Sequence, residues 1–297
     1  MGEYRDLQIL GVGKQPGGRF GKVLIAGSGK FTGDLECEEF SVPGAGKVED
    51  GGLTVHGPIS CHGACKVEGP VQAQDLSVHG AFSVESGCEI RGDASILGSL
   101  KTEGPCVVEG AAEVTGTLKT EDAFRGKHVR VSGVLKAEAG MRGEEFEVSG
   151  VLKAEGDVQA ERFRASGPVT VEGELNAETV ELQLEGESEI ESIVGGSVSV
   201  RAAREDGGAQ RSGFRVHLDL SIPFFGARKL DYDGGSSRPH LAATLIEADE
   251  IDLEFTDCET VRGVNVRIGP ECVIDRVEYS GSLVTDPNCT VREKLKI

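Results

Sequence analysis

Five residues that could take part in metal or thiol chemistry lie close together in the chain: His56, Cys61, His62, Cys65 and His79. A zinc site needs four convergent ligands, and cysteine ligands usually come in closely spaced pairs such as C-x-x-C. That spacing is absent from the sequence. The apolar alternation around the two cysteines turns their thiols inward, where free cysteine acts as a small hydrophobic residue. We therefore expect core and surface filling here, with no metal site and no cofactor; redox regulation is the alternative.

A lysine followed two residues later by a glutamate recurs in the tetrads LKTE, LKTE, LKAE and LKAE, which follow one another at a nearly constant spacing. The members of this candidate binding stripe are Lys101, Lys119, Lys136, Lys153, Glu103, Glu121, Glu138 and Glu155. Stacked like charges repel one another, and a neighbouring column of opposite charge offsets that repulsion. The stripe is either a charge-compensated solvent face or a regular binding surface for peptidoglycan, lipid headgroups or another protein.

A third group combines apolar and basic side chains in the segment IPFFGARK (residues 222–229). Its candidate membrane or partner contact consists of Phe224, Phe225, Arg228 and Lys229. An apolar wedge beside basic groups can touch a membrane surface, but a short one binds weakly. Packing against the rest of the molecule is the alternative. We expect a pocket only near this segment, where the candidates are His217, Asp219, Arg228, Asp231, Tyr232 and Asp233.

The composition narrows the class of protein. Of 297 residues, 43 are glycine, none is tryptophan, and the formal net charge is -19. Frequent glycine disfavours long helices, and the negative charge disfavours nucleic-acid binding, which needs phosphate neutralisation. No apolar run reaches the ~20 residues of a membrane span, and the first residues show no signal-peptide pattern. We expect a cytoplasmic protein, with the inner face of the membrane as an alternative location.

The glycines reveal an internal repeat. They recur at a nearly constant interval, at Gly63, Gly80, Gly98, Gly116, Gly133, Gly150 and Gly167. Between them, apolar residues alternate with polar ones, as in GPCVVE (residues 104–109) and GPVTVE (residues 167–172). Alternation of period two predicts short strands with one buried face, and the glycines predict turns, often with positive φ. The segment GSGKFTG (residues 27–33) lacks the full phosphate-loop pattern and is interpreted as further turns.

Residues one repeat apart line up in apolar columns. Two of these columns are Phe82, Leu100, Leu118, Leu135, Leu152 and Val169, and Ile96, Val114, Val131, Val148, Ala165 and Leu182. Such columns predict an all-β solenoid, a single-stranded parallel β-helix with triangular rungs of about 17–18 residues. A left-handed hexapeptide helix needs three equal hexads in each rung, and most rungs here are one residue short of that. We therefore favour the right-handed form.

The repeat also divides the chain into parts. We predict a flexible N-terminal tail over residues 1–20 and a β-helix over residues 21–203. A loop and strand excursion follows over residues 204–240, where the period is lost. C-terminal rungs occupy residues 241–297, where Ile251 and Ile268, Val266 and Leu283, and Ile274 and Val291 are each one repeat apart.

The glycine-punctuated rungs over about residues 23–203 resemble those of bactofilins, the polymer-forming cytoskeletal proteins of bacteria. The segment IEADEIDLEFTDCETVRGVNVRIGPECVIDRVEYSG (residues 246–281) is similar to the C-terminal part of bactofilin-related proteins from Gram-positive, spore-forming bacteria. The resemblance implies a right-handed β-helix, end-to-end assembly without nucleotide, and a scaffold role at the membrane or envelope. This chain is longer than a typical bactofilin and carries the excursion.

These observations lead us to expect a protein that is not an enzyme. The first hypothesis is a bactofilin-like cytoskeletal scaffold that polymerises through its ends and organises cell-envelope processes. The ends would be residues 21–42 and the last rung at residues 289–291, and the charged tail REKLKI (residues 292–297) blunts the second. A non-polymerising adaptor for a protein or envelope partner is the alternative, followed by an acyltransferase or a carbohydrate-active β-helix enzyme. The expected partners are further copies, envelope or membrane-associated proteins and weakly a membrane, but no nucleic acid.

Overall fold

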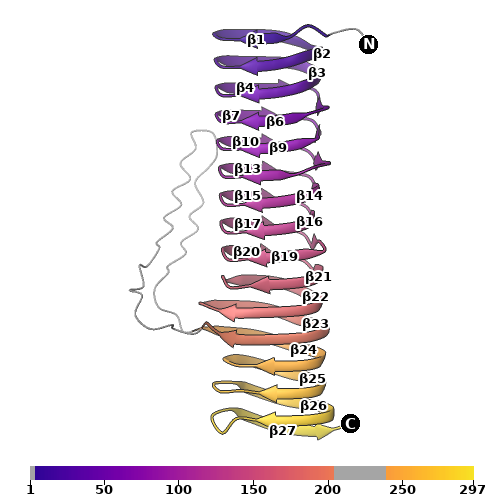
Figure 1. Ribbon diagram of the computed structural model, residues 1–297, viewed down its shortest axis with the longest axis vertical. Helices are drawn as coiled ribbons and strands as arrows, with labels where there is room; N and C mark the ends of the chain where they lie inside the picture. Colours follow the sequence, from indigo (N-terminus) through magenta and orange to yellow (C-terminus); the bar gives the residue numbers. More distant parts are fainter. Residues whose placement is uncertain (1–3, 204–238) are drawn as a thin grey trace, which may run out of the picture.

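The computed structural model describes residues 4–203 and 239–297. These residues form an all-β solenoid of about fifteen turns, with the two termini at opposite ends of a rod (Figure 1). Each middle turn adds one strand to each of three ladders of parallel strands, as β10, β11 and β12 do. The predicted parallel solenoid is confirmed. None of the described residues belongs to a helix that could span a membrane.

The described strands of the first half are β1 (Leu7–Ile9), β2 (Val12–Ile25), β3 (Ser28–Val42), β4 (Ala45–Glu49), β5 (Leu53–Val55), β6 (Pro58–Cys61), β7 (Ala64–Val67), β8 (Val71–Ala73), β9 (Asp75–Val78), β10 (Ala81–Val84), β11 (Cys88–Ile90), β12 (Ala94–Ile96), β13 (Ser99–Thr102) and β14 (Cys106–Val114). Those of the second half are β15 (Thr117–Thr120), β16 (Phe124–Val131), β17 (Val134–Ala137), β18 (Met141–Arg142), β19 (Glu145–Val148), β20 (Val151–Ala154), β21 (Val158–Ala165), β22 (Val169–Leu184), β23 (Glu187–Ala202), β24 (His240–Leu253), β25 (Thr256–Ile268), β26 (Val273–Thr285) and β27 (Thr290–Lys296).

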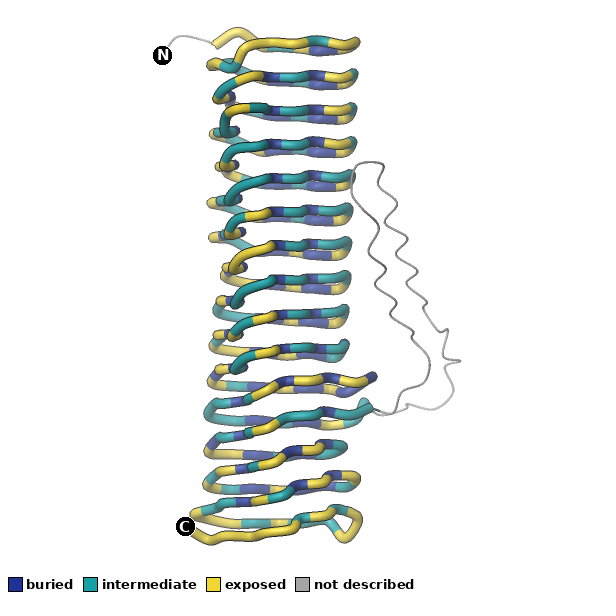
Figure 2. The backbone as a smooth tube through the Cα atoms, turned by 180° about the vertical axis from the view of Figure 1, so that it is seen from behind, coloured by how far each residue is buried: buried dark blue, intermediate teal, exposed yellow. Residues whose placement is uncertain are grey.

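The alternating apolar residues form the core that the sequence predicts. Along each turn, buried positions alternate with half-buried or exposed ones (Figure 2). The column predicted from Ile96 to Leu182 is confirmed by the strand registers. The same column extends through the whole rod as Ile9, Ile25, Val42, Cys61, Val78, Ile96, Val114, Val131, Val148, Ala165, Leu182, Val200, Leu253 and Ile268. One continuous hydrophobic core therefore runs from the first turns almost to the last.

The repeated glycines lie at one corner of the rod, but the reason differs from the prediction. Among the described glycines only Gly18 and Gly33 have clearly positive φ angles. A Cβ atom added to Gly116 would instead lie 2.0 Å from the carbonyl oxygen of Gly98, on the preceding turn. Contacts closer than 3.0 Å essentially never occur for real Cβ atoms. The corner therefore requires glycine because successive turns approach each other closely there.

The predicted N-terminal tail is wrong from Leu7 onward. Strand β1 pairs with β2, and β2 pairs with β3 along most of its length. The sequence pattern did not reveal this turn because few of its side chains are buried: Ile9, Val23 and Ile25 lie in the core, whereas the rest of β2 is exposed or half-buried. At the end of a solenoid the apolar alternation fades although the backbone pairing continues.

The solenoid continues across the residues that interrupt the repeat. Strand β23 pairs in parallel register with β24, so that Val198 lies beside Ile251. The backbone N–H groups of Ala203 and His240 both bond to the corner that joins β22 to β23, at Leu184 and Gly186. The described residues on the two sides of this gap, Ala203 and His240, thus lie at the same corner of the rod.

The C-terminal turns differ in length from the prediction. Ile251 stacks on Val266, not on Ile268, because this turn is shorter than the repeat. The predicted pairs Val266 with Leu283 and Ile274 with Val291 are confirmed.

Candidate functional site

The candidate binding stripe forms a continuous ladder of ion pairs on one face of the rod. The four lysines lie in register on β13, β15, β17 and β20. Lys101 contacts Glu103 on its own turn at 3.4 Å and Glu121 on the next turn at 2.8 Å. Lys119, Lys136 and Lys153 repeat this pattern, with distances of 2.8–2.9 Å to the glutamate of the next turn. The structure therefore brings all eight predicted residues together.

The ladder begins earlier than the four tetrads. Lys30 contacts Glu49, and Lys47 bridges Glu49 at 2.5 Å and Glu68 at 3.1 Å. Hydrogen bonds from Lys30 and then Lys47 lower the pKa of Glu49 from its usual 4.5 to about 2. Ser83 interrupts the lysine column between Lys66 and Lys101. Because Lys47 and the four tetrad lysines are each shared between two carboxylates, this face presents compensated charge and not a row of unpaired cations.

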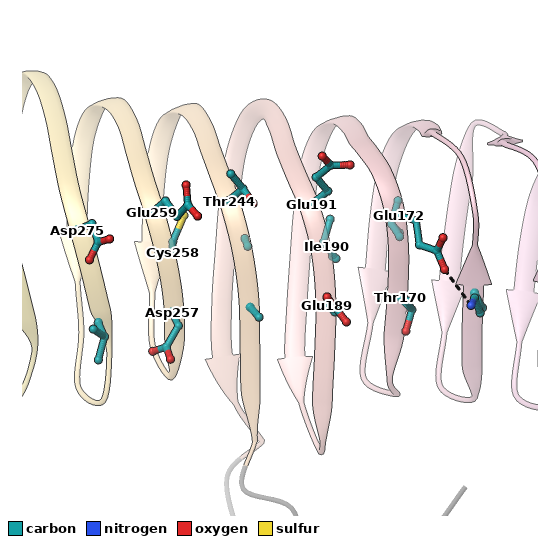
Figure 3. A pocket seen from close by; sticks show the side chains of 15 residues that line it. Thr170, Glu172, Glu189, Ile190, Glu191, Thr244, Asp257, Cys258, Glu259 and Asp275 are labelled. Atoms are coloured by element: carbon teal, nitrogen blue, oxygen red, sulfur yellow. Dashed lines mark ion pairs between the residues drawn. The ribbon is translucent and has the colours of Figure 1, made fainter. Parts of the chain in front are cut away.

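Beyond Lys153 the basic column ends and an acidic groove begins. The register continues through Thr170, Glu189, Ala242 and Asp257, none of which is basic. The groove has a volume of about 700 Å³. Its carboxylates are Glu172, Glu189, Glu191, Asp257, Glu259 and Asp275 (Figure 3). This face of the rod thus carries compensated charge up to Lys153 and mainly acidic side chains beyond it.

Three of these carboxylates have basic partners. Asp257 lies 3.2 Å from the imidazole of His240, and Asp275 lies 2.8 Å from Arg292. Glu172 pairs with Lys153 at 2.9 Å, the ion pair drawn dashed in Figure 3. The sequence signal for this groove was available, because the lysine of the tetrad is absent from every turn after residue 153.

The side chains of the histidine and cysteine cluster do not converge on a common metal position. His62 and His79 lie on neighbouring turns, with ring centroids 4.6 Å apart and planes within 9°. Cys61 and Cys65 are buried, and burial raises the pKa of the Cys61 thiol to about 11. Within the described residues no three potential ligands are placed to hold a metal ion. The predicted inward orientation of the two thiols is confirmed, and the imidazoles of His62 and His79 lie at the exposed surface.

A pair of stacked arginines was missed by the sequence reasoning. Arg125 on β16 and Arg142 on β18 occupy adjacent in-register positions on the outward face. Further along the same outward column, Arg262 lies between two carboxylates, 3.0 Å from Glu247 and 2.8 Å from Glu278. Arg125 and Arg142 line a hollow of about 350 Å³ beside two glycines. The constant repeat spacing could have revealed this contact.

The two ends of the rod are the remaining candidate sites. The first half of β2, residues 12–20, pairs only with β3, and β27 pairs only with β26. Each end therefore leaves one backbone edge open within the described residues. An open parallel edge exposes N–H and C=O groups that can pair with another strand.

Several predicted residues lie outside the described part of the chain. They are Phe224, Phe225, Arg228 and Lys229, together with the pocket candidates His217, Asp219, Asp231, Tyr232 and Asp233. Their proposed membrane, partner or pocket roles stay predictions.

Comparison with known proteins gives only partial matches. The chain is 48% identical over 60 residues to the uncharacterized protein YhbE of Bacillus subtilis, which covers 20% of this chain and 25% of that protein. It is 42% identical over 57 residues to the uncharacterized protein YhbF of the same organism, covering 19% and 24% of the two chains. The chain therefore spans about a quarter of the length of the curated relatives it matches. No protein-family model and no solved structure matches it.

Proposed function

We propose that this protein is a non-enzymatic, bactofilin-like cytoskeletal scaffold that associates with further copies through the ends of its solenoid. The observation that carries the proposal is a long parallel β-rod with an open backbone edge at each end. The glycine-punctuated repeat that resembles bactofilins supports the same function. We place the scaffold in the cytoplasm or at the inner face of the membrane, where it organises envelope processes.

The proposed assembly uses the same interaction that builds the rod. Each turn hydrogen-bonds to the turns on either side of it, and a turn of a second molecule can take the place of the missing neighbour. Apolar column ends are then withdrawn from water, which favours association. Neither nucleotide nor metal enters this scheme.

The paired charges along the sides complement this proposal. Lysines of the stripe are already engaged by two carboxylates each. Side-to-side association through this face would have to replace ion pairs that exist within one molecule. End contacts meet no such competition and are therefore the preferred route.

Sedimentation velocity over a hundredfold concentration range, combined with negative-stain electron microscopy, tests the proposal. Scaffold assembly predicts that, at the higher concentrations, particles are longer than a single rod at the same width. Single rods at every concentration would contradict it and would favour the non-polymerising adaptor instead.

A further inference from the structure

The N-terminal end of the core is uncharged. The residues that terminate the core columns there are Leu7, Ile9, Gly13, Gln15, Gly18 and Phe20. Apolar side chains beside them face solvent, since Leu10 is 71% exposed and Val12 is 91% exposed. At this end the column ends are therefore apolar or neutral and lie beside an open backbone edge, whereas charged side chains of the same turn, such as Lys14 and Arg19, lie at outward positions.

The C-terminal end is built differently. Strand β27 places Lys294 below Val277 and Lys296 below Tyr279, both in columns that are otherwise apolar. The Lys294 Nζ donates a hydrogen bond of 3.3 Å to Thr285 Oγ1, on the last strand segment of another face. The Lys294 side chain therefore lies across the open end of the core.

The second lysine lies beside an aromatic ring at the same end. The Lys296 Nζ is 5.8 Å from the centroid of the Tyr279 ring, a cation–π contact. Inward-pointing charge at a sheet edge is a known device against edge-to-edge pairing, because a partner strand would bury the charge. The acidic groups needed to neutralise two buried ammonium groups are absent from the six N-terminal column ends.

We infer that copies of this chain join only through their N-terminal turns, and that Lys294 and Lys296 close the C-terminal end. This inference rests on the proposed self-association. A contact between two identical N-terminal ends is isologous and has twofold symmetry. The edge strands, residues 12–20 of each copy, then run antiparallel across the contact, an arrangement that β-pairing accepts.

Joining through one end limits the assembly to two molecules. Both free ends of the pair are closed C-terminal turns, so that no further copy can be added. With about fifteen turns at ~4.8 Å each, one rod is about 70 Å long and a pair is about 140 Å long. The pair would have twice the 31.2 kDa mass of the chain.

Light scattering and negative-stain electron microscopy of the full chain test the inference. We expect rods of doubled length that dissociate on dilution but do not grow on concentration. The variant Gln15→Lys places an ammonium group in an N-terminal core column, as Lys294 does at the other end, and should give single rods. Circular dichroism verifies that it keeps its strands, because Gln15 is exposed and fills no core space.

Opening the C-terminal end is the complementary experiment. The double variant Lys294→Leu/Lys296→Leu should convert pairs into long filaments. The matched control is Arg292→Leu, which removes a charge from the same strand but from an outward position paired with Asp275. It should remain a pair.

The outcomes separate the two proposals. Long filaments of the unmodified chain would overturn the closed C-terminal end and leave the scaffold proposal standing. Unmodified chain that stays monomeric at all concentrations would overturn self-association itself. Pairs that persist unchanged in Gln15→Lys, or a double variant that forms no filaments, would show that these column ends do not decide the contact.

Discussion

At the scale of single residues, the side chain that fits at a position in this rod depends on the residue one turn away. Gly116 shows this most directly, because a Cβ atom there would lie 2.0 Å from the carbonyl oxygen of Gly98. We expect Gly116→Ala to force the two turns apart and to destabilise the rod by about 1–3 kcal/mol, the usual cost of overpacking. Urea unfolding followed by circular dichroism measures this loss.

Gly11 supplies the control for that substitution. It occupies the same corner in the first turn, opposite Gly27, and a Cβ atom there would meet nothing within 4 Å. Gly11→Ala should therefore leave the unfolding midpoint nearly unchanged. Equal losses in the two variants would mean that backbone freedom, and not the close approach, explains the glycines.

The stacked pair Arg125 and Arg142 gives a second prediction at this scale. Like charges directly opposite each other in a sheet are destabilising, and opposite charges contribute roughly 0.2–1 kcal/mol. Arg142→Glu should thus stabilise the protein by about that amount, and less at high salt. Arg262→Glu is the control with the opposite expected sign. Because Arg262 already lies between Glu247 and Glu278, this substitution should destabilise the protein. An unfolding midpoint that rises in both variants would contradict the pairing argument.

At the scale of strands, the ion-pair ladder makes stability depend on pH. The pKa values of Glu49, Glu68 and Glu138 are all lowered, for Glu49 and Glu138 mainly by hydrogen bonds from ladder lysines and for Glu68 by the backbone N–H of Asp50 followed by Lys47. A carboxyl with a lowered folded-state pKa stabilises the fold above its usual pKa and loses that contribution as pH falls through the lowered value. We expect the unfolding midpoint to fall between about pH 5 and pH 2, a window that follows from the usual pKa of 4.5 and the folded value of about 2 for Glu49.

Removing one ladder lysine should weaken that dependence. Lys47 bonds both Glu49 and Glu68, so Lys47→Gln returns both pKa values toward normal and flattens the acid limb of the stability profile. Lys127→Gln is the control, since Lys127 lies outside the ladder, 3.5 Å from Glu144. An unchanged acid limb in Lys47→Gln would show that the ladder contributes nothing to it.

The strands also show where sequence reasoning succeeds. Between Phe82 and Leu182 each turn buries a full set of apolar residues, so a constant spacing identified every predicted neighbour. The stripe of lysines and glutamates followed from the same spacing. The first turn was missed because most of its residues cap the core without being buried in it. The neighbour of Ile251 was predicted wrongly because a shorter turn keeps the apolar alternation but has fewer residues between stacked positions.

At the scale of the whole molecule, the continuity of the rod past residue 203 carries a prediction. Because β23 and β24 pair directly, the residues between Ala203 and Pro239 should be dispensable for the solenoid. Replacing residues 204–238 with a short glycine-rich link should preserve the circular dichroism spectrum and the unfolding midpoint. Loss of C-terminal turns, detected as new proteolytic cleavage after residue 240, would contradict this.

The stacking of turns also means that the number of turns determines the length of the molecule. Each turn contacts only the turn before and the turn after it, so its contribution is local. Inserting one more repeat unit between, for example, β17 and β20 would lengthen the rod by ~4.8 Å while leaving both end surfaces intact. Length and end chemistry are thus independent properties of this chain. Duplication of a short stretch of coding sequence can set the distance between whatever the two ends touch.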